Sequence, residues 1–171
     1  YILGLYLAQV RGNKYADEIA DYMDKLAAIP AAISRVLDNG ESVRQFARTM
    51  QDATSVIYLG RHVGFPVALE GALKLKEICY IHAEGFAAGE LKHGPIALVD
   101  EAQPVIVIVP TPRRPELHGK VLAKIPEVRA RGSRTIIIAE EGDFSVDEFA
   151  AVVLRDPAVP TPYAPTLQVV P

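Results

Sequence analysis

The run PVIVIVP, from Pro104 to Pro110, places five β-branched apolar residues in a row between two prolines. Similar runs are SVIYL at Ser55–Leu59 and TIIIA at Thr135–Ala139, and Ala151–Leu154 is a shorter candidate. An unbroken apolar run of this length is typical of a strand that is buried on both faces. These runs therefore predict the strands of a sheet that is covered on both sides.

Amphipathic segments precede and separate the runs, and each has apolar residues at helical spacing. They are residues 14–38, with an interruption near Pro30, residues 41–51, residues 66–80 and residues 115–130. Buried strands that alternate with helices form a parallel sheet with helices on both faces and right-handed crossovers. The predicted fold is of the α/β class, a three-layer α/β/α sandwich with a mostly parallel sheet.

The composition fits one globular unit and argues against two classes of partner. The chain has 171 residues, half of them apolar, and a formal net charge of -3. A nucleic-acid surface needs a clustered excess of Lys and Arg, and a bilayer span needs about 20 apolar residues; the sequence has neither. A single cysteine cannot form an internal disulfide, which fits the cytoplasm. We therefore expect a cytoplasmic protein that binds neither nucleic acid nor membrane.

The residues after the first predicted strand form a candidate cradle for an anion. Gly60-Arg61-His62-Val63-Gly64 leads into a helix at the strand end where α/β sheets bind their ligands. The loop lacks the third glycine of a dinucleotide fingerprint and the GK[ST] ending of a phosphate-binding loop. It therefore predicts either substrate binding through Gly60 and Arg61 or a simple tight turn.

The helix predicted at residues 66–80 carries the densest group of ionisable residues. At about 100° per residue, Glu70, Lys74 and Glu77 fall within an arc of about 60°. One hypothesis is a solvated face on which Glu70 and Lys74 form an ordinary helical ion pair. The other is a catalytic face on which they fix the position and charge of Glu77 as a general base. Because the helix begins at the carboxyl end of a strand, its position favours the catalytic hypothesis.

His93 is a second titratable candidate, because Lys92-His93-Gly94-Pro95 predicts an exposed turn. An imidazole in such a turn either reaches a substrate or is an ordinary surface histidine. We predict that His82 ends a helix and that Cys79 is buried on the apolar stripe of that helix, where its thiol would be a poor nucleophile. No metal-ligand spacing such as HExxH is present, so we expect neither a metal nor a cofactor.

The segment Ala68–Val99, ALEGALKLKEICYIHAEGFAAGELKHGPIALV, resembles the isomerase part of the glutamine–fructose-6-phosphate aminotransferases. The resemblance extends to Gly60-Arg61, to VIVIVP, to EVRARG at Glu127–Gly132 and to the terminal APTLQVVP. Those enzymes join a glutaminase domain to two sugar-isomerase (SIS) domains, and they convert fructose 6-phosphate and glutamine to glucosamine 6-phosphate and glutamate. The resemblance implies that residues 1–13 end the preceding SIS domain or its linker, and that residues 14–171 form the second SIS domain, truncated at its C-terminus.

The resemblance also implies residue roles. Glu77 corresponds to the base that moves a proton between C1 and C2 of the fructosimine, and Lys74 to the lysine that contacts the sugar and the base. Glu70 corresponds to an acid that supports the histidine, and His93 to the histidine that assists ring opening across a dimer interface. The implied partners are a phosphosugar substrate and a second copy of the chain. Because the glutaminase domain and the first SIS domain are missing here, we expect this chain alone to lack synthase activity.

Two other classes of function stay open. A SIS module also serves as a phosphosugar sensor in transcription regulators, which would need an attached helix-turn-helix and a basic face. Related SIS enzymes are deglycases or aldose–ketose isomerases that act on other phosphosugars.

Overall fold

The computed structural model describes residues 1–171 and contains one five-stranded sheet in which every neighbouring pair is parallel. The strands are β1 (Ser55–Gly60), β2 (His82–Ala87), β3 (Pro104–Ile108), β4 (Arg134–Glu140) and β5 (Val152–Asp156). Their order is β2-β1-β3-β4-β5, so the chain steps from β1 outward to β2 and then returns to place β3 on the other side of β1. This reversal makes the carboxyl ends of β1 and β3 the switch point of the sheet.

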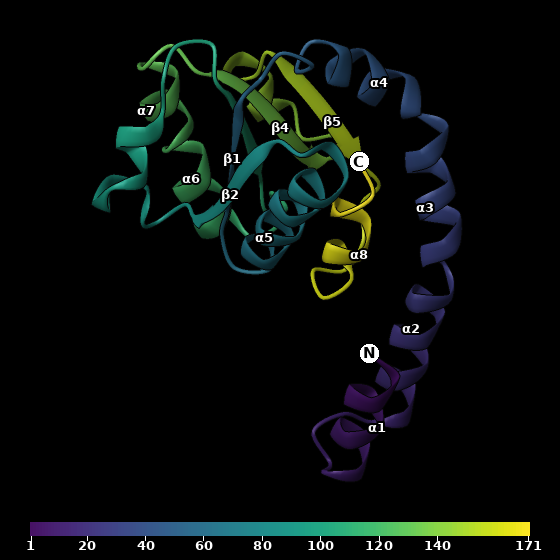
Figure 1. The fold of residues 1–171 in the computed structure, drawn as a ribbon. Coiled ribbons are helices and arrows are strands. Elements are labelled where there is room, and N and C mark those ends of the chain that lie inside the picture. The colour runs from purple at the N-terminus through teal and green to yellow at the C-terminus, as the bar shows by residue number, and fades with distance from the viewer.

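Eight α-helices precede or cover the sheet. They are α1 (Ile2–Val10), α2 (Ala16–Ala27), α3 (Ile29–Asp38), α4 (Gly40–Arg48), α5 (Gly64–Lys74), α6 (Pro115–Leu122), α7 (Ile125–Arg129) and α8 (Ala164–Gln168). Figure 1 shows α6 and α7 on one face of the sheet and α5 and α8 on the other, while α2 and α3 form an arm that ends far from the sheet. The predicted three-layer α/β/α sandwich is confirmed.

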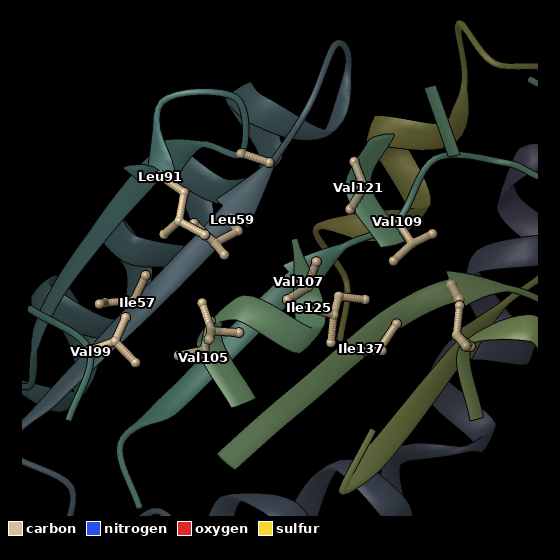
Figure 2. Packing of buried hydrophobic residues seen from close by; sticks show 14 residues of the cluster. Ile57, Leu59, Leu91, Val99, Val105, Val107, Val109, Val121, Ile125 and Ile137 are labelled. Carbon is tan, nitrogen blue, oxygen red and sulfur yellow. The ribbon is translucent and has the colours of Figure 1, made fainter. Parts of the chain in front are cut away.

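The buried strands divide the core into two layers. On β3, Val105 and Val107 pack with residues of α6 and α7, in the layer that Figure 2 shows. The alternate residues Ile106 and Ile108 pack with residues of α4 and α5. Successive side chains of a strand point to opposite faces, and here both faces are covered. The unbroken apolar run of β3 follows from that double burial.

The helical arm is tied to the C-terminal segment by Tyr163. The Tyr163 side chain is buried with Ile29 and Leu167, and its hydroxyl donates to the carbonyl oxygen of Tyr22 at 3.0 Å. The ring of Tyr1 packs edge-on against the Tyr163 ring with the centroids 4.8 Å apart. The first and last parts of the chain therefore meet at one aromatic side chain.

Three elements differ from the sequence prediction. The helix predicted at residues 115–130 is divided into α6 and α7, because Pro126 cannot donate to a continuous helical ladder. Neither α8 nor β2 was predicted, and β2 (HAEGFA) is an edge strand without an apolar run. A Cβ at Gly85 would lie 2.8 Å from the carbonyl oxygen of Ala68 on α5. Close packing of α5 on β2 therefore requires the glycine that weakens the strand pattern.

Candidate active site

The loop after β1 lies at the switch point of the sheet. A Cβ at Gly60 would meet the carbonyl oxygen of Gly64 at 2.0 Å, so the turn itself requires glycine. The Arg61 side chain reaches over Gly89 in the loop after β2, with Nη1 3.2 Å from where a Cβ would lie. His62 has a positive φ of 55° and lines a cavity of about 20 Å³ between this loop and the one after β3. The tight-turn interpretation explains Gly60, and substrate binding by Arg61 stays a prediction.

Glu70, Lys74 and Glu77 lie on one face, as their spacing predicts. Lys74 Nζ donates to Glu77 Oε2 at 2.7 Å and lies 3.6 Å from Glu70 Oε1. Each of these side chains is about half exposed. The hydrogen bond with Glu77 raises the pKa of Lys74, and Glu70 adds a smaller contribution, so the amine stays an ammonium. The shorter contact is with Glu77, which distinguishes this trio from a simple pair between Glu70 and Lys74.

The helix widens into a π-turn over Leu75–Cys79, directly after Lys74. A π-turn takes more residues per turn, so the residues that follow rotate away from their α-helical positions. Cys79 is exposed for this reason, and the prediction that it is buried is wrong. Ile78 and Tyr80 are 70% and 90% exposed, and Tyr80 closes the turn with a positive φ of 58°. Single π-turns within helices are frequent at functional sites.

The trio lies far from the switch point. Helix α5 starts at the carboxyl end of β1 and runs back toward the amino end of β2. At about 1.5 Å per residue, Glu77 lies about 20 Å from the start of the helix. The helix begins at the carboxyl end of a strand, as predicted, but only its first turn lies there, so this position does not by itself favour the catalytic hypothesis for the trio. His82 begins β2 and does not end a helix, which corrects a second prediction.

His93 lies beyond the opposite end of β2, in a 3₁₀ turn over Leu91–His93. The predicted exposed turn is confirmed, and Gly94 follows with a φ of 145° that favours glycine. Nδ1 of His93 lies 2.7 Å from Glu90 Oε2, whereas Glu70 pairs with Lys74. The six residues of β2 cover about 17–20 Å. One chain therefore holds the Glu70, Lys74 and Glu77 trio and His93 at opposite ends of β2.

A buried pair that the sequence does not signal joins α6 to the loop after β4. Nε2 of His118 lies 2.7 Å from Oδ2 of Asp143, and both residues are buried. The Ser145 hydroxyl donates to Oδ1 of Asp143 at 2.6 Å. Burial alone would raise the pKa of Asp143, but the hydrogen bonds from Ser145 and His118 outweigh it and lower that pKa. Ser145 faces Asp143 and not the imidazole, so the arrangement is a structural tie and not a nucleophile relay.

No group of three or more His, Cys, Asp or Glu side chains is arranged to hold a metal ion. None of the helices combines the length and the apolar character that crossing a membrane requires.

The family model described as the SIS domain matches residues 49–171, from the end of α4 to the last residue. The chain belongs to the SIS domain family. The matched part of this SIS domain contains every predicted site residue, namely Gly60, Arg61, Glu70, Lys74, Glu77 and His93.

Curated relatives of this SIS domain are larger enzymes. Over its whole length the chain is 63% identical to the glutamine–fructose-6-phosphate aminotransferase (isomerizing) of Corynebacterium efficiens. It is 51% identical to the protein of the same name from Mycobacterium tuberculosis. The chain spans 28% of the length of each of these relatives.

Solved structures extend the comparison. The C-terminal domain of glucosamine-fructose-6-phosphate aminotransferase from Francisella tularensis superposes with a TM-score of 0.89 at 36% identity, over 99% of this chain and 47% of that one. The sugar isomerase domain of an RpiR transcription factor from Sphaerobacter thermophilus superposes with a TM-score of 0.70 at 15% identity, over 86% of this chain and 84% of that one. The second likeness shows the fold alone, so the SIS fold by itself does not separate enzymes from regulators.

Proposed function

We propose that this SIS domain is the isomerase part of an enzyme that makes glucosamine 6-phosphate from fructose 6-phosphate and glutamine. The observation that carries the proposal is the 2.7 Å contact between Lys74 and Glu77 on an exposed helix end. It is supported by identity of 51–63% along the whole chain to the aminotransferases of several bacteria. The regulator with the same fold shares only 15% identity, which favours the enzyme.

In this proposal Glu77 is the general base. Its carboxylate takes a proton from C1 of the fructosimine, the C1=C2 double bond forms, and the C2=N bond becomes an amine as the nitrogen gains a proton from solvent. Glu77 then returns its proton to C2, while the C1 hydroxyl loses its proton to solvent and becomes the aldehyde. Lys74 holds the carboxylate in place through the hydrogen bond that its ammonium donates.

The active unit in this proposal is a homodimer in which His93 acts in the site of the partner subunit. Glu77 and His93 lie at opposite ends of β2 in one chain, so one copy does not bring both to a single sugar. Glu90 holds Nδ1 of His93, which leaves Nε2 for a ligand. A site shared between two copies removes this separation.

The rest of the enzyme would lie outside this chain. We propose that residues 1–13 end the preceding SIS domain or its linker and that residues 14–171 form the second SIS domain. A glutaminase domain would supply ammonia, and the first SIS domain would hold the sugar phosphate. The exposed apolar side chains of α1, among them Ile2, Leu3 and Val10, fit a helix that packs on a neighbouring domain. The single exposed thiol of Cys79 fits a cytoplasmic location.

The test uses the full-length protein that carries this SIS domain, with ammonia in place of glutamine so that glutamine hydrolysis does not contribute to the measured rate. Glu77→Gln should lower glucosamine 6-phosphate formation from fructose 6-phosphate by about 10²–10⁴-fold. Glu41→Gln is the matched control, because Glu41 forms an exposed helical pair with Arg44, and its turnover should be unchanged. Unchanged turnover of Glu77→Gln would remove Glu77 from the mechanism. Phosphosugar binding without turnover by the unsubstituted protein would favour a sensor.

A further inference from the structure

Asp156 is a buried carboxylate and the last residue of β5. Alternation along β5 places Asp156 on the same face as Leu154, which packs in the core layer of α4 and α5. The register pairs Asp156 with Glu140 on β4. Asp156 is only 4% exposed, although it lies at the carboxyl end of the strand, where most charged side chains reach solvent.

The carboxylate has no hydrogen-bond donor from the protein. Both Oδ1 and Oδ2 of Asp156 are buried without a partner, and so is Oε1 of Gln168 on α8. Asp156 and Gln168 line the same cavity of about 20 Å³, together with Thr111 and Glu140. Three buried acceptor atoms without a donor are a costly arrangement, because buried polar groups in native proteins are almost always paired.

The other charges around the cavity are already paired. Both carboxylate oxygens of Glu140 accept from the Arg113 guanidinium, which also donates to the carbonyl oxygen of Val159 at 2.8 Å. Further out, Glu141 forms an exposed pair with Arg35. Asp156 is therefore the one carboxylate of the cavity without a counter-charge. Burial raises the pKa of Asp156 to about 7, so the group ionises in the neutral range.

We propose that this cavity, between the carboxyl ends of β4 and β5 and helix α8, binds one dehydrated monovalent cation of the size of K⁺ or NH₄⁺. The unpaired atoms are carboxylate and amide oxygens, which are the ligands that a hard cation prefers. One uncompensated carboxylate matches a single positive charge. The cavity holds about one water-sized particle, which excludes a hydrated divalent ion.

The test compares thermal unfolding of the purified protein in choline, sodium, potassium and ammonium chloride at equal ionic strength. At about pH 8, potassium or ammonium should raise the midpoint above that in choline by about 3 °C, and the rise should shrink at about pH 6 as Asp156 is protonated. Asp156→Asn should abolish the cation effect, whereas Asp52→Asn, at an exposed residue, should keep it.

Two results would overturn the proposal. Equal midpoints in all four salts would show that a water molecule, or a protonated Asp156 paired with Gln168, satisfies the cavity. A cation effect that persists in Asp156→Asn would place the ion elsewhere. Crystals grown with Rb⁺ give a direct readout that does not depend on stability. An anomalous peak between Asp156 and Gln168 is expected, and its absence would contradict the site.

Discussion

Lys74 and Glu77 form a 2.7 Å ion pair across the junction at which α5 becomes a π-turn. The two residues are three positions apart in the sequence, and both side chains lie on the surface. The pair contributes little to folding through its energy of association, because exposed ion pairs are screened by water. Its proposed role is catalytic, because a carboxylate that is oriented by an ammonium can act as a general base.

Removal of the Lys74 charge should damage catalysis and leave stability intact. Lys74→Met keeps the length of the side chain but removes the ammonium from Glu77 and Glu70. In the full-length enzyme we expect a fall of about 10²-fold in ammonia-dependent glucosamine 6-phosphate formation, because the Glu77 carboxylate loses the donor that orients it. Lys25→Met, which breaks the exposed pair with Asp21, is the control. Unchanged turnover in Lys74→Met would contradict the proposed role of Lys74.

A shared active site predicts complementation between two inactive variants. We expect full-length Glu77→Gln and His93→Ala to be inactive as homodimers. In a mixed dimer, one site receives Glu77 from one subunit and His93 from the other. Random mixing should restore about one quarter of the unsubstituted activity, because half the dimers are mixed and each has one intact site. No recovery in verified mixed dimers would assign Glu77 and His93 to the same subunit's site.

The SIS domain alone should bind fructose 6-phosphate weakly and form no glucosamine 6-phosphate. None of the trio residues lines the cavity at the switch point, and the trio is half exposed to solvent. Isothermal titration calorimetry of the 171-residue chain checks this expectation. Micromolar affinity would contradict this expectation and show that the residues that bind the phosphate lie within this chain.

Contact between α5 and β2 should make Gly85 intolerant of a side chain. In Gly85→Ala the new Cβ would lie 2.8 Å from the carbonyl oxygen of Ala68, and we expect a loss of about 1–3 kcal/mol in the free energy of unfolding. Gly119→Ala is the matched control, because no atom lies within 4 Å of its Cβ position inside α6. Gly119→Ala should raise the free energy of unfolding by about 0.5–1 kcal/mol, because alanine has a higher helix propensity than glycine. Urea denaturation measures the free energy of unfolding of both variants. Equal effects would contradict the close packing of Gly85 against α5.

The buried pair of His118 and Asp143 should give the protein a defined acid sensitivity. The pKa of Asp143 is lower in the folded chain than in the unfolded one. Its contribution is therefore present above the unfolded pKa of about 4 and is lost as the pH falls through the folded pKa. We expect Asp143→Asn to lose about 1–3 kcal/mol of unfolding free energy near pH 7, and the difference should shrink below about pH 4. A difference that is constant with pH would contradict an ionised Asp143.

Local pattern predicted the interior of the fold well. The continuous runs at β1, β3 and β4 mark strands that are covered on both faces, and the π-turn did not prevent Glu70, Lys74 and Glu77 from sharing a face. The edge strand β2 was not predicted, because it lacks an apolar run. Its Gly85 is required by close contact with α5, and a local stretch of sequence does not reveal that contact.

The sequence by itself determined the class of the fold, the trio on one helix face, the exposed turn of His93 and the SIS family. These follow from periodicity, turn chemistry and motif, which act over a few neighbouring residues. Only the tertiary structure decided that α5 carries Glu77 away from the switch point, that β2 separates it from His93, and that Asp156 has no counter-charge. Those facts depend on where distant segments meet, because burial, charge pairing and the length of a strand are set by packing across the whole chain.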